Sequence, residues 1–593
     1  MRFEAPRCSL ATILGAAASA LLFSLLAGCG QPDAGGAHDA LPDAGQDAHS
    51  DAGSIADAGI DVVDARAETG PPPVDAGLSC TPPDAGGTDG GLPPSTMGNL
   101  VPLPSTVTPA AGTFKLTAAA SIYVEPASAE MMAVGQYLAG KLRTATGYPI
   151  PVAATSGPPP FPSCNGSLYL TTAGGDPSLG AEGYTLGVSP EQVRLSAYQA
   201  AGIFHGVQTI RQLLPPGIES ATAQAGPWSI QAGAIRDVPR FAWRGTMLDV
   251  ARHFFSVPDV ETYIDILPYY KINTLHLHLT DDQGWRIAID SWPNLATYGG
   301  STEVGGGAGG YYTHSDYSAI VAYAAARYIT IVPEIDMPGH TNAALASYAD
   351  LDCNGVAPPL YTGTTVGASS LCVNNDANTY QFVSDVIGEV AALTPGPYLH
   401  VGGDEATATS PADFQSFFAK VQPIVKTAGK TMCGWDAVGQ VTGLSPGSIV
   451  QLWGPNDGNF AQQAVSQGAK ILMSPAKLTY MDMKYDASTP YGQTWAGYID
   501  ERTAYGWDPA TAVAGIAEAN IVGVEAPLWT EYIPTLPDVE YMAFPRLAGY
   551  AEIGWSPAAG RSWDEYKVRI GSQGSRLKSM GVNVYESSEI PWQ

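Results

Sequence analysis

The second half of the chain alternates short apolar runs with longer stretches of helical periodicity, and this constrains the fold more than any other feature. Parallel strands joined by helical crossovers close into a barrel when eight of them follow one another. We therefore predict an α/β fold with a (β/α)8 TIM barrel over residues 239–593. The predicted strands are 243–250, 274–280, 329–335, 398–402, 431–435, 449–453, 470–473 and 521–526. The predicted helices are 259–270, 315–326, 379–393, 411–427, 460–467 and 538–551.

The segment before the barrel, residues 99–238, does not alternate strands and helices in the same regular way. Short strands are predicted at 121–124, 167–171 and 192–196, and amphipathic helices at 127–144 and 198–214. This mixture predicts a smaller α+β domain. Its residues form no pattern that suggests catalysis.

The first 28 residues are predicted to be a secretory signal. Arg2 and Arg7 precede an apolar run from Leu10 to Ala27, which ends in a small-residue cleavage site. Residues 26–29, Leu-Ala-Gly-Cys, resemble a bacterial lipobox, which would make Cys29 the lipidated first residue of the mature protein. The alternative is an uncleaved anchor helix, because the run barely reaches the ~18–20 residues that span a bilayer. Both interpretations place the body outside the cytoplasm, attached to a bacterial membrane through its N-terminus and facing the periplasm or the cell surface.

Residues 29–98 are predicted to be an extended tether. Asp-Ala-Gly recurs six times, at 33–35, 43–45, 51–53, 57–59, 75–77 and 84–86, with prolines between and few large apolar residues. Such a chain cannot bury enough surface to offset its ordering entropy. A calcium-binding repeat is the alternative, but the acidic spacing and the closing Glu of an EF-hand loop are missing.

The charge of the chain limits its partners. Lys and Arg number 28 against 56 Asp and Glu, which gives a net charge of −28. Phosphate binding needs a basic footprint, so nucleic acid is not expected as a partner. The membrane is expected only through the N-terminal lipid, and the oligomeric state is left open.

The cysteines fit an oxidising compartment. Cys353 and Cys372 bracket a loop of small and polar residues and are the favoured disulfide pair. Cys80 and Cys164 are a second candidate pair if the end of the tether folds back. Cys433 lies in an apolar strand and is predicted to be a buried free thiol.

Carboxylates, histidines and aromatic side chains follow the predicted barrel strands one after another. Since the carboxyl ends of barrel strands meet on one face, these residues should surround one site. Aromatic faces stack on pyranose rings, while carboxylates and arginine hold hydroxyls through charge-assisted hydrogen bonds. Core positions seldom take unpaired acids, so the set predicts a sugar site rather than a core. Its members are Asp249, Arg252, His276, His278, Asp281, Asp282, Glu334, Asp336, His340, Asp404, Glu405, Trp435, Asp436, Trp453, Tyr480, Asp482, Trp529 and Glu531.

Several of these residues lie in motifs of one enzyme family. The segment HVGGDE at 400–405 resembles the signature of the β-N-acetylhexosaminidases, glycoside hydrolase family twenty. Five other segments agree in order: LDVARHF at 248–254, HLHLTDD at 276–282, PEIDMPGH at 333–340, YMD at 480–482 and EAPLWTE at 525–531. The likeness runs from about residue 100 to the C-terminus. It implies a TIM barrel behind a smaller α+β domain, and a retaining, exo-acting hydrolase of terminal N-acetylhexosamines that needs no cofactor or metal.

The resemblance also assigns catalytic roles. This family is an exception to the two-carboxylate scheme, because the 2-acetamido oxygen of the substrate attacks the anomeric carbon. Glu405 would be the general acid and then the base, Asp404 would accept the acetamido N–H, and Tyr480 would donate to the acetamido oxygen. Adjacent residues on a regular strand face opposite ways, so the fourth strand must twist or end before both carboxylates reach the sugar.

The remaining roles implied by the resemblance concern binding and support. Arg252 and Glu531 would hold sugar hydroxyls, Asp482 would add a polar contact, and Trp495 would serve the leaving sugar. The predicted substrate-binding set is Arg252, Asp281, His340, Trp435, Trp453, Asp482, Trp495, Trp529 and Glu531. Asp281 and His340 are also expected to support Glu405, together with Asp336 and His278.

Three alternatives compete with this assignment. His276 and His278 on one strand suit a zinc hydrolase, which would also need histidines at later strand ends, where only His340 and His400 are available. A glycan-binding lipoprotein without activity would keep the aromatics and lose the acid, yet Glu405 is present. A specialised relative would release a disaccharide or a sulphated sugar instead of a monosaccharide.

Overall fold

The computed structural model describes residues 97–158, 165–367, 369–454 and 458–593. The predicted signal segment, Cys29, the tether, Cys80 and Cys164 lie outside these ranges. Within them, every helix is too short or too polar to cross a bilayer.

The N-terminal α+β domain is built on one mixed sheet. Its seven strands are β1 (Thr106–Lys115), β2 (Ile122–Glu125), β3 (Val152–Ala154), β4 (Leu168–Thr171), β5 (Tyr184–Val188), β6 (Val193–Ala197) and β7 (Ser229–Asp237), in the order β1-β7-β5-β6-β4-β2-β3. Helix α1 (Ala129–Thr146) packs against β2 and β3, and α2 (Ala200–Leu213) packs against β5 and β6. The three predicted strands and both helices are present. The strands that sequence reasoning missed include β1, which is mostly exposed and therefore lacks a clear apolar alternation.

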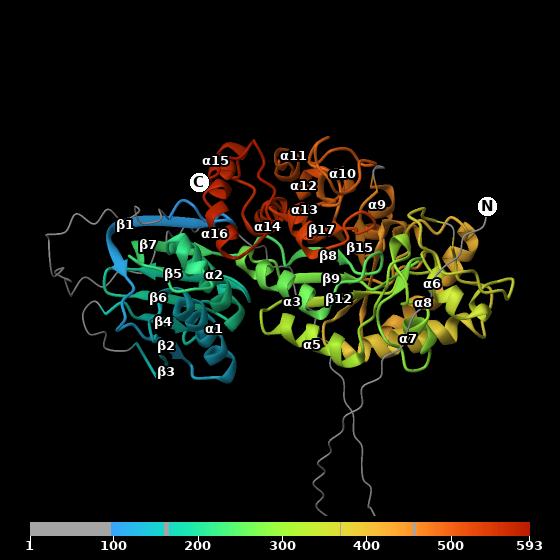
Figure 1. The fold of residues 1–593 in the computed structure, drawn as a ribbon, viewed down its shortest axis with the longest axis horizontal. Helices are drawn as coiled ribbons and strands as arrows, with labels where there is room; N and C mark the ends of the chain where they lie inside the picture. The colour runs from blue at the N-terminus through green and yellow to red at the C-terminus, as the bar shows by residue number, and fades with distance from the viewer. Residues whose placement is uncertain (1–96, 159–164, 368, 455–457) are drawn as a thin grey trace, which may run out of the picture. The chain divides into compact units, whose positions relative to one another are not determined.

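Eight parallel strands then close into a barrel, which confirms the predicted fold class (Figure 1). They are β8 (Trp243–Asp249), β9 (Thr274–His278), β12 (Thr330–Glu334), β13 (Tyr398–His400), β14 (Thr431–Trp435), β15 (Ile449–Leu452), β16 (Lys470–Met473) and β17 (Ile521–Leu528). The last strand pairs with the first, from Gly523 opposite Trp243 to Leu528 opposite Leu248. Every predicted barrel strand is found, with ends shifted by at most a few residues.

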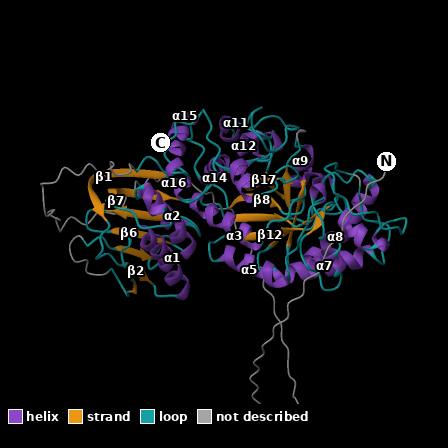
Figure 2. Ribbon diagram, in the orientation of Figure 1, coloured by secondary structure: helices purple, strands orange, loops and turns teal. Residues whose placement is uncertain are grey.

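Helices follow most of the barrel strands (Figure 2). The main ones are α3 (Val257–Ile266), α5 (His314–Ala325), α7 (Thr379–Leu393), α8 (Pro411–Thr427), α9 (Asn459–Ser466), α13 (Leu536–Ala543) and α14 (Arg546–Trp555). The continuous helix predicted over 538–551 is wrong, because the structure divides it into α13 and α14 at Pro545. Proline has no N–H to donate, and its ring clashes with the preceding turn, so the first helix ends before it.

Sequence reasoning also missed short elements in the connections. They are the hairpin β10 (Thr280–Asp281) and β11 (Gly284–Trp285), and the helices α4 (Asn294–Thr297), α6 (Asn342–Ser347), α10 (Ala476–Thr479), α11 (Glu501–Tyr505), α12 (Pro509–Ala512), α15 (Trp563–Gly571) and α16 (Gly574–Ser579). Six are too short to show a helical period. Single 3-10 turns complete the connections, at 177–179, 216–219, 267–270, 304–306, 349–351, 436–440 and 518–520.

Each domain has its own apolar core, and α14 joins the two. Trp555, the last residue of α14, is fully buried and belongs to the core of the α+β domain. Its indole nitrogen donates to Asp237 Oδ1 over 2.9 Å, and Lys271 Nζ lies 2.9 Å from Asp237 Oδ2. These contacts of Asp237 with Trp555 and Lys271 fasten the α+β domain to the barrel.

The cysteines within the described residues occur in two states. Cys353 and Cys372 form a disulfide, with their Cα atoms 4.7 Å apart. Cys433 in β14 is a buried free thiol, as predicted.

Candidate active site

The turn after β13 presents two adjacent carboxylates. The strand ends at His400, and Gly402 and Gly403 follow with φ of 65° and 100°. A Cβ atom on Gly402 would lie 1.6 Å from Asp336 Oδ1, so only glycine fits there. Glu405 itself has a φ of 42°, in the left-handed region that non-glycine residues seldom adopt. The strand thus ends before Asp404 and Glu405, and the alternation of a regular strand does not separate them.

His340 lies between these two carboxylates and Asp281. Its Nε2 atom is 3.4 Å from Glu405 Oε2 and 3.7 Å from Asp404 Oδ2. Burial raises the pKa of Asp404 to about 6, and the opposing effect of His340 does not cancel it. The Glu405 side chain keeps 34% of its surface exposed, so it is the more accessible acid of the pair.

A buried ion network holds His340 in place. Its Nδ1 atom is 3.2 Å from Asp281 Oδ1, and Asp281 Oδ2 is 2.7 Å from Arg252 Nη2 and 2.9 Å from His278 Nε2. Burial alone favours neutral imidazole, but Asp281 and Asp404 outweigh it and raise the pKa of His340 well above its usual range. Asp281 is 1% exposed and fully engaged by these cations, so the structure places it behind the site as a support.

Five aromatic side chains come from the ends of β14, β15 and β17 and from the connection after β16. Tyr480 and Trp453 stack with ring centroids 6.4 Å apart, and Trp529 lies 6.2 Å from Tyr480. Trp435 is fully buried beneath them, and its indole nitrogen donates to Glu334 Oε1 over 2.8 Å. Trp495 meets Tyr480 edge-on and is 52% exposed, so it lies at the outer rim.

Charged and polar groups lie beside Trp529. Arg252 Nη1 lies 3.7 Å from Glu531 Oε1, and the guanidinium carbon sits 4.9 Å from the centre of the Trp529 ring. Gln283, which sequence reasoning missed, accepts from Arg252 Nε over 3.2 Å. Gln283 directly follows the Asp281-Asp282 pair in the chain, and this position next to two site residues could have indicated that it belongs to the site. Burial, followed by the charge of Glu531, raises the pKa of Asp482 well above its usual range.

Many polar atoms in this site are buried without a hydrogen-bond partner among the described residues. Buried polar groups are normally paired, so a concentration of unpaired ones marks a surface built for a polar ligand. They include acceptors and donors, which suits a ligand carrying hydroxyls and an amide. The atoms are Asp336 Oδ2, His340 Nε2, Asp404 Oδ1, Trp453 Nε1, Asp482 Oδ1 and Oδ2, and Glu531 Oε2.

The two histidines that suggested a zinc hydrolase lie with His400 around Glu334 inside the barrel, and His278 also joins the ion network through Asp281. Glu334 lies 2.5 Å from His278 Nδ1, 3.0 Å from His276 Nε2 and 2.8 Å from His400 Nδ1. Glu525 adds a contact of 2.9 Å to His276 Nδ1. The imidazoles thus face carboxylates at hydrogen-bond distance and support the floor of the site.

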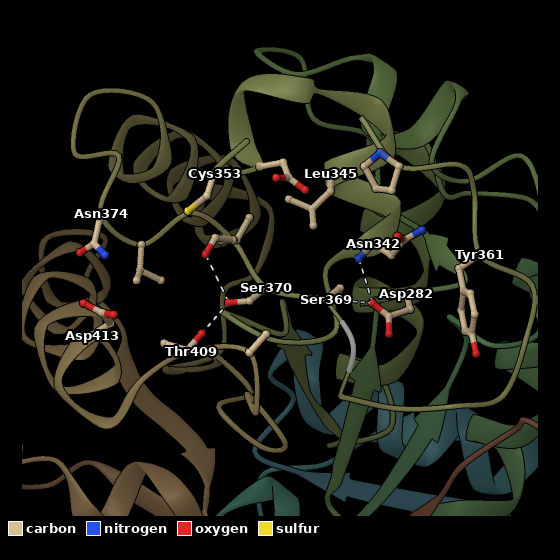
Figure 3. Close-up of a pocket in the computed structure, with 15 residues that line it drawn as sticks. Asp282, Asn342, Leu345, Cys353, Tyr361, Ser369, Ser370, Asn374, Thr409 and Asp413 are labelled. Carbon is tan, nitrogen blue, oxygen red and sulfur yellow. Dashed lines mark hydrogen bonds between the residues drawn. The ribbon is translucent and has the colours of Figure 1, made fainter. Parts of the chain in front are cut away.

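A cavity of about 340 Å³ opens beside the site, on the side of α6 (Figure 3). Asp282 lines this cavity: its Oδ1 atom accepts from the backbone N–H of Asn342 over 2.9 Å and from the hydroxyl of Ser369. Asp282, which was predicted to lie at the rim of the sugar site, therefore lines this neighbouring cavity, while Asp281 belongs to the ion network.

Comparison with known proteins identifies the family. Residues 241–558 match the family model described as Glycosyl hydrolase family 20, catalytic domain, and residues 98–238 match Glycosyl hydrolase family 20, domain 2. The chain belongs to glycosyl hydrolase family 20. The resemblance predicted from the motifs is thereby confirmed, and the chain is a glycoside hydrolase of the β-N-acetylhexosaminidase family. This membership favours neither the zinc hydrolase nor the non-catalytic alternative.

Relatives of this family 20 chain cover more than four-fifths of its length. A beta-N-acetylhexosaminidase of Cellulomonas fimi is 40% identical over 480 residues, which are 81% of this chain and 94% of that protein. The Streptomyces coelicolor A3(2) GH20 beta-N-acetylhexosaminidase is 51% identical with a TM-score of 0.81, covering 85% of this chain and 100% of that one. A mutant Streptomyces plicatus beta-hexosaminidase in complex with product (GlcNAc) is 52% identical with a TM-score of 0.81, covering 85% and 99%.

Proposed function

We propose that this family 20 chain removes terminal β-linked N-acetylglucosamine or N-acetylgalactosamine from oligosaccharides, with retention, through an oxazolinium ion. One observation carries the proposal: the turn after β13 brings buried Asp404 and accessible Glu405 to one aromatic site. The product named for the Streptomyces plicatus relative, GlcNAc, supports the choice of sugar.

The first step forms the oxazolinium ion. The acetamido oxygen attacks the anomeric carbon, while Glu405 gives its proton to the departing glycosidic oxygen. Asp404 accepts the acetamido N–H and stabilises the positive charge that develops on this group. Tyr480 donates its hydroxyl proton to the acetamido oxygen in a hydrogen bond, which orients that oxygen for the attack.

The second step returns the enzyme to its starting state. Glu405, now a carboxylate, takes a proton from a water molecule as the water attacks the anomeric carbon. The C–O bond of the oxazoline ring breaks, and the acetamido group is restored. Two inversions at one carbon give net retention.

The shape of the site supports exo action. Arg252, Glu531 and Asp482 supply buried polar atoms suited to the hydroxyls of a terminal sugar. Trp453 and Trp529 offer faces for the ring, and exposed Trp495 stands where the next sugar would leave. Trp435 is buried behind these aromatic side chains, and its hydrogen bond to Glu334 holds it in position.

Two chromogenic β-glycosides that differ only at C2 test the proposal. One carries a 2-acetamido group and the other a 2-hydroxyl group. We expect the full chain to release the chromophore from the acetamido sugar alone, because only that sugar supplies the nucleophile. Equal release from both would contradict substrate assistance. Release from neither would favour a specialised relative that frees a disaccharide or a sulphated sugar.

The raised pKa of Asp404 predicts an acid limb in the pH profile. Asp404 stabilises the developing positive charge only as a carboxylate, so kcat/KM should fall as pH drops through about 6, the pKa to which burial raises this group. A profile of kcat/KM from pH 4 to 8 checks this. The Asp404→Asn variant should lose this limb along with most of its activity. If the variant kept an acid limb with the same midpoint, the titration would belong to another group.

We further propose that the protein is a lipoprotein, with residues 1–28 as its signal peptide and Cys29 as the lipidated residue. The tether of residues 29–98 would then hold the enzyme away from a bacterial membrane, within reach of polymers such as chitin. Metabolic labelling with a fatty-acid analogue should mark the wild-type chain and leave Cys29→Ser unmarked. Equal labelling of both would contradict lipidation at Cys29.

A further inference from the structure

We propose that residues 369–373 form a brace that positions Glu405, by linking the three loops that carry Asp281, His340 and Glu405. The brace lies along the cavity beside the site and contacts no sugar in the proposed mechanism (Figure 3). Its members are therefore positioning residues. The inference rests on the proposed role of Glu405 as the general acid.

The first link joins the brace to the loop after β13. The hydroxyls of Ser370 and Thr409 are 2.5 Å apart. Thr409 donates its backbone N–H to the carbonyl of Ala406 over 3.0 Å, and Thr407 donates to the carbonyl of Glu405 over 2.6 Å. Ser370 is thereby connected to the turn that contains the acid.

The second link joins the brace to the loop after β12, which ends at His340. Leu371 donates its backbone N–H to the carbonyl of Pro338 over 2.9 Å, and Ser370 pairs with Gly339 as an antiparallel bridge. A Cβ atom on Gly339 would lie 3.2 Å from Ala406 Cα and 3.3 Å from the carbonyl oxygen of Asp404. The loops of His340 and Glu405 therefore pack directly on each other beneath the brace.

The third link joins the brace to the loop after β9. The hydroxyl of Ser369 donates to Asp282 Oδ1 and accepts the backbone N–H of Thr341 over 2.8 Å. Asp282 directly follows Asp281, whose carboxylate orients His340. One serine thus connects the Asp281 loop with the residue after His340.

A covalent bond anchors the brace to the rest of the barrel. Cys372 is joined to Cys353 by the disulfide, and its backbone N–H donates to the carbonyl of Leu351 over 2.8 Å. The hydroxyl of Thr379, at the start of α7, donates to the carbonyl of Cys372 over 2.7 Å. The brace therefore has a fixed end, and its three links transmit that position to the catalytic loops.

Glu405 needs such support for a physical reason. Its backbone is left-handed, and one-third of its side-chain surface is exposed, so the neighbouring side chains enclose it only in part. A backbone in a sparsely populated region persists only where the surroundings over-determine it. General acid catalysis requires the carboxyl within hydrogen-bond reach of the glycosidic oxygen, and a shift of about 1 Å can cost up to a hundredfold in rate.

The test separates acid catalysis from general damage by means of the leaving group. The 2,4-dinitrophenyl glycoside of N-acetylglucosamine departs without a proton, whereas the 4-methoxyphenyl glycoside needs one. We expect Ser370→Ala and Thr409→Val to lower kcat/KM about tenfold on the methoxyphenyl substrate and less than about twofold on the dinitrophenyl one. Asn374→Ala is the matched control, because Asn374 lines the same cavity and should leave both values unchanged.

The comparison with Glu405→Gln separates the two proposals. If Glu405→Gln shows the leaving-group dependence and the brace variants do not, the brace inference is wrong and the proposed function stands. If Glu405→Gln itself shows no such dependence, the proposed role of the acid fails first. Equal losses on both substrates in Ser370→Ala would also overturn the inference. The paired variant Cys353→Ser, Cys372→Ser gives a second measurement, and it should show the same selective loss.

Discussion

Glu405→Gln is expected to lose about 10²–10⁴-fold in kcat on a glycoside with a poor leaving group, while KM changes little. Glutamine keeps the shape of the side chain but has no acidic proton to transfer to the glycosidic oxygen. Glu405 reaches the substrate from a left-handed turn and keeps a third of its side chain exposed, so binding should not depend on its charge. Steady-state kinetics with the methoxyphenyl and dinitrophenyl glycosides measure the effect.

A second variant at the same position checks the base role. Glu405→Ala removes the base that activates water, so sodium azide, which needs no deprotonation, should restore turnover on the dinitrophenyl substrate. The product should be the β-glycosyl azide, because azide attacks the oxazolinium ion from the face that the aglycone left. An α-azide product, or no rescue, would be inconsistent with an oxazolinium intermediate whose hydrolysis Glu405 assists as the base.

Asp404→Asn is expected to lose about 10²–10³-fold in kcat on the acetamido substrate, comparable to the removal of one oxyanion-hole donor. The amide oxygen accepts the acetamido N–H less strongly than a carboxylate does, and it carries no charge to stabilise the oxazolinium ion. Asp404 is buried and its Oδ1 atom has no partner among the described residues, so this oxygen is available to the acetamido N–H.

Asp482→Asn is the matched control for this variant. Asp482 is also buried, and both of its carboxylate oxygens are unpaired within the described part of the chain. In the proposed mechanism it contacts a sugar hydroxyl rather than the acetamido group, so its loss should raise KM more than it lowers kcat. If both variants lowered kcat by the same factor, the special role of Asp404 would be lost.

Sequence patterns predicted the barrel well because each strand and helix is a local, periodic signal. All eight strands appear at the predicted places, and the motifs at their ends gave the family. Helix and strand boundaries were predicted less well where the apolar periodicity was weak or where a proline within it was overlooked. Strand β1 is too exposed to alternate, and Pro545 ends α13 although the apolar period continues past it.

The candidate site was predicted as a set of residues and not as an arrangement. Asp281 and Asp282 are neighbours in the chain, yet Asp281 joins Arg252, His278 and His340, while Asp282 lines the adjacent cavity. Trp435 and Trp495 carry the same side chain, but one is fully buried and the other is 52% exposed. Sequence spacing does not distinguish such pairs.

The amino-acid sequence by itself determined the order of strands and helices, the family motifs and the identity of the acids, because these depend on residues close together in the chain. Only the tertiary structure decided which polar atoms remain unpaired, how Gly402 and Gly403 turn Asp404 and Glu405 to one side, and how residues 369–373 connect three loops. Those features arise from contacts between segments far apart in sequence. An example is the close approach of Asp336 to Gly402, where a Cβ atom would lie only 1.6 Å from Asp336 Oδ1. Closure of the barrel brings these segments together, and local patterns carry no record of that proximity.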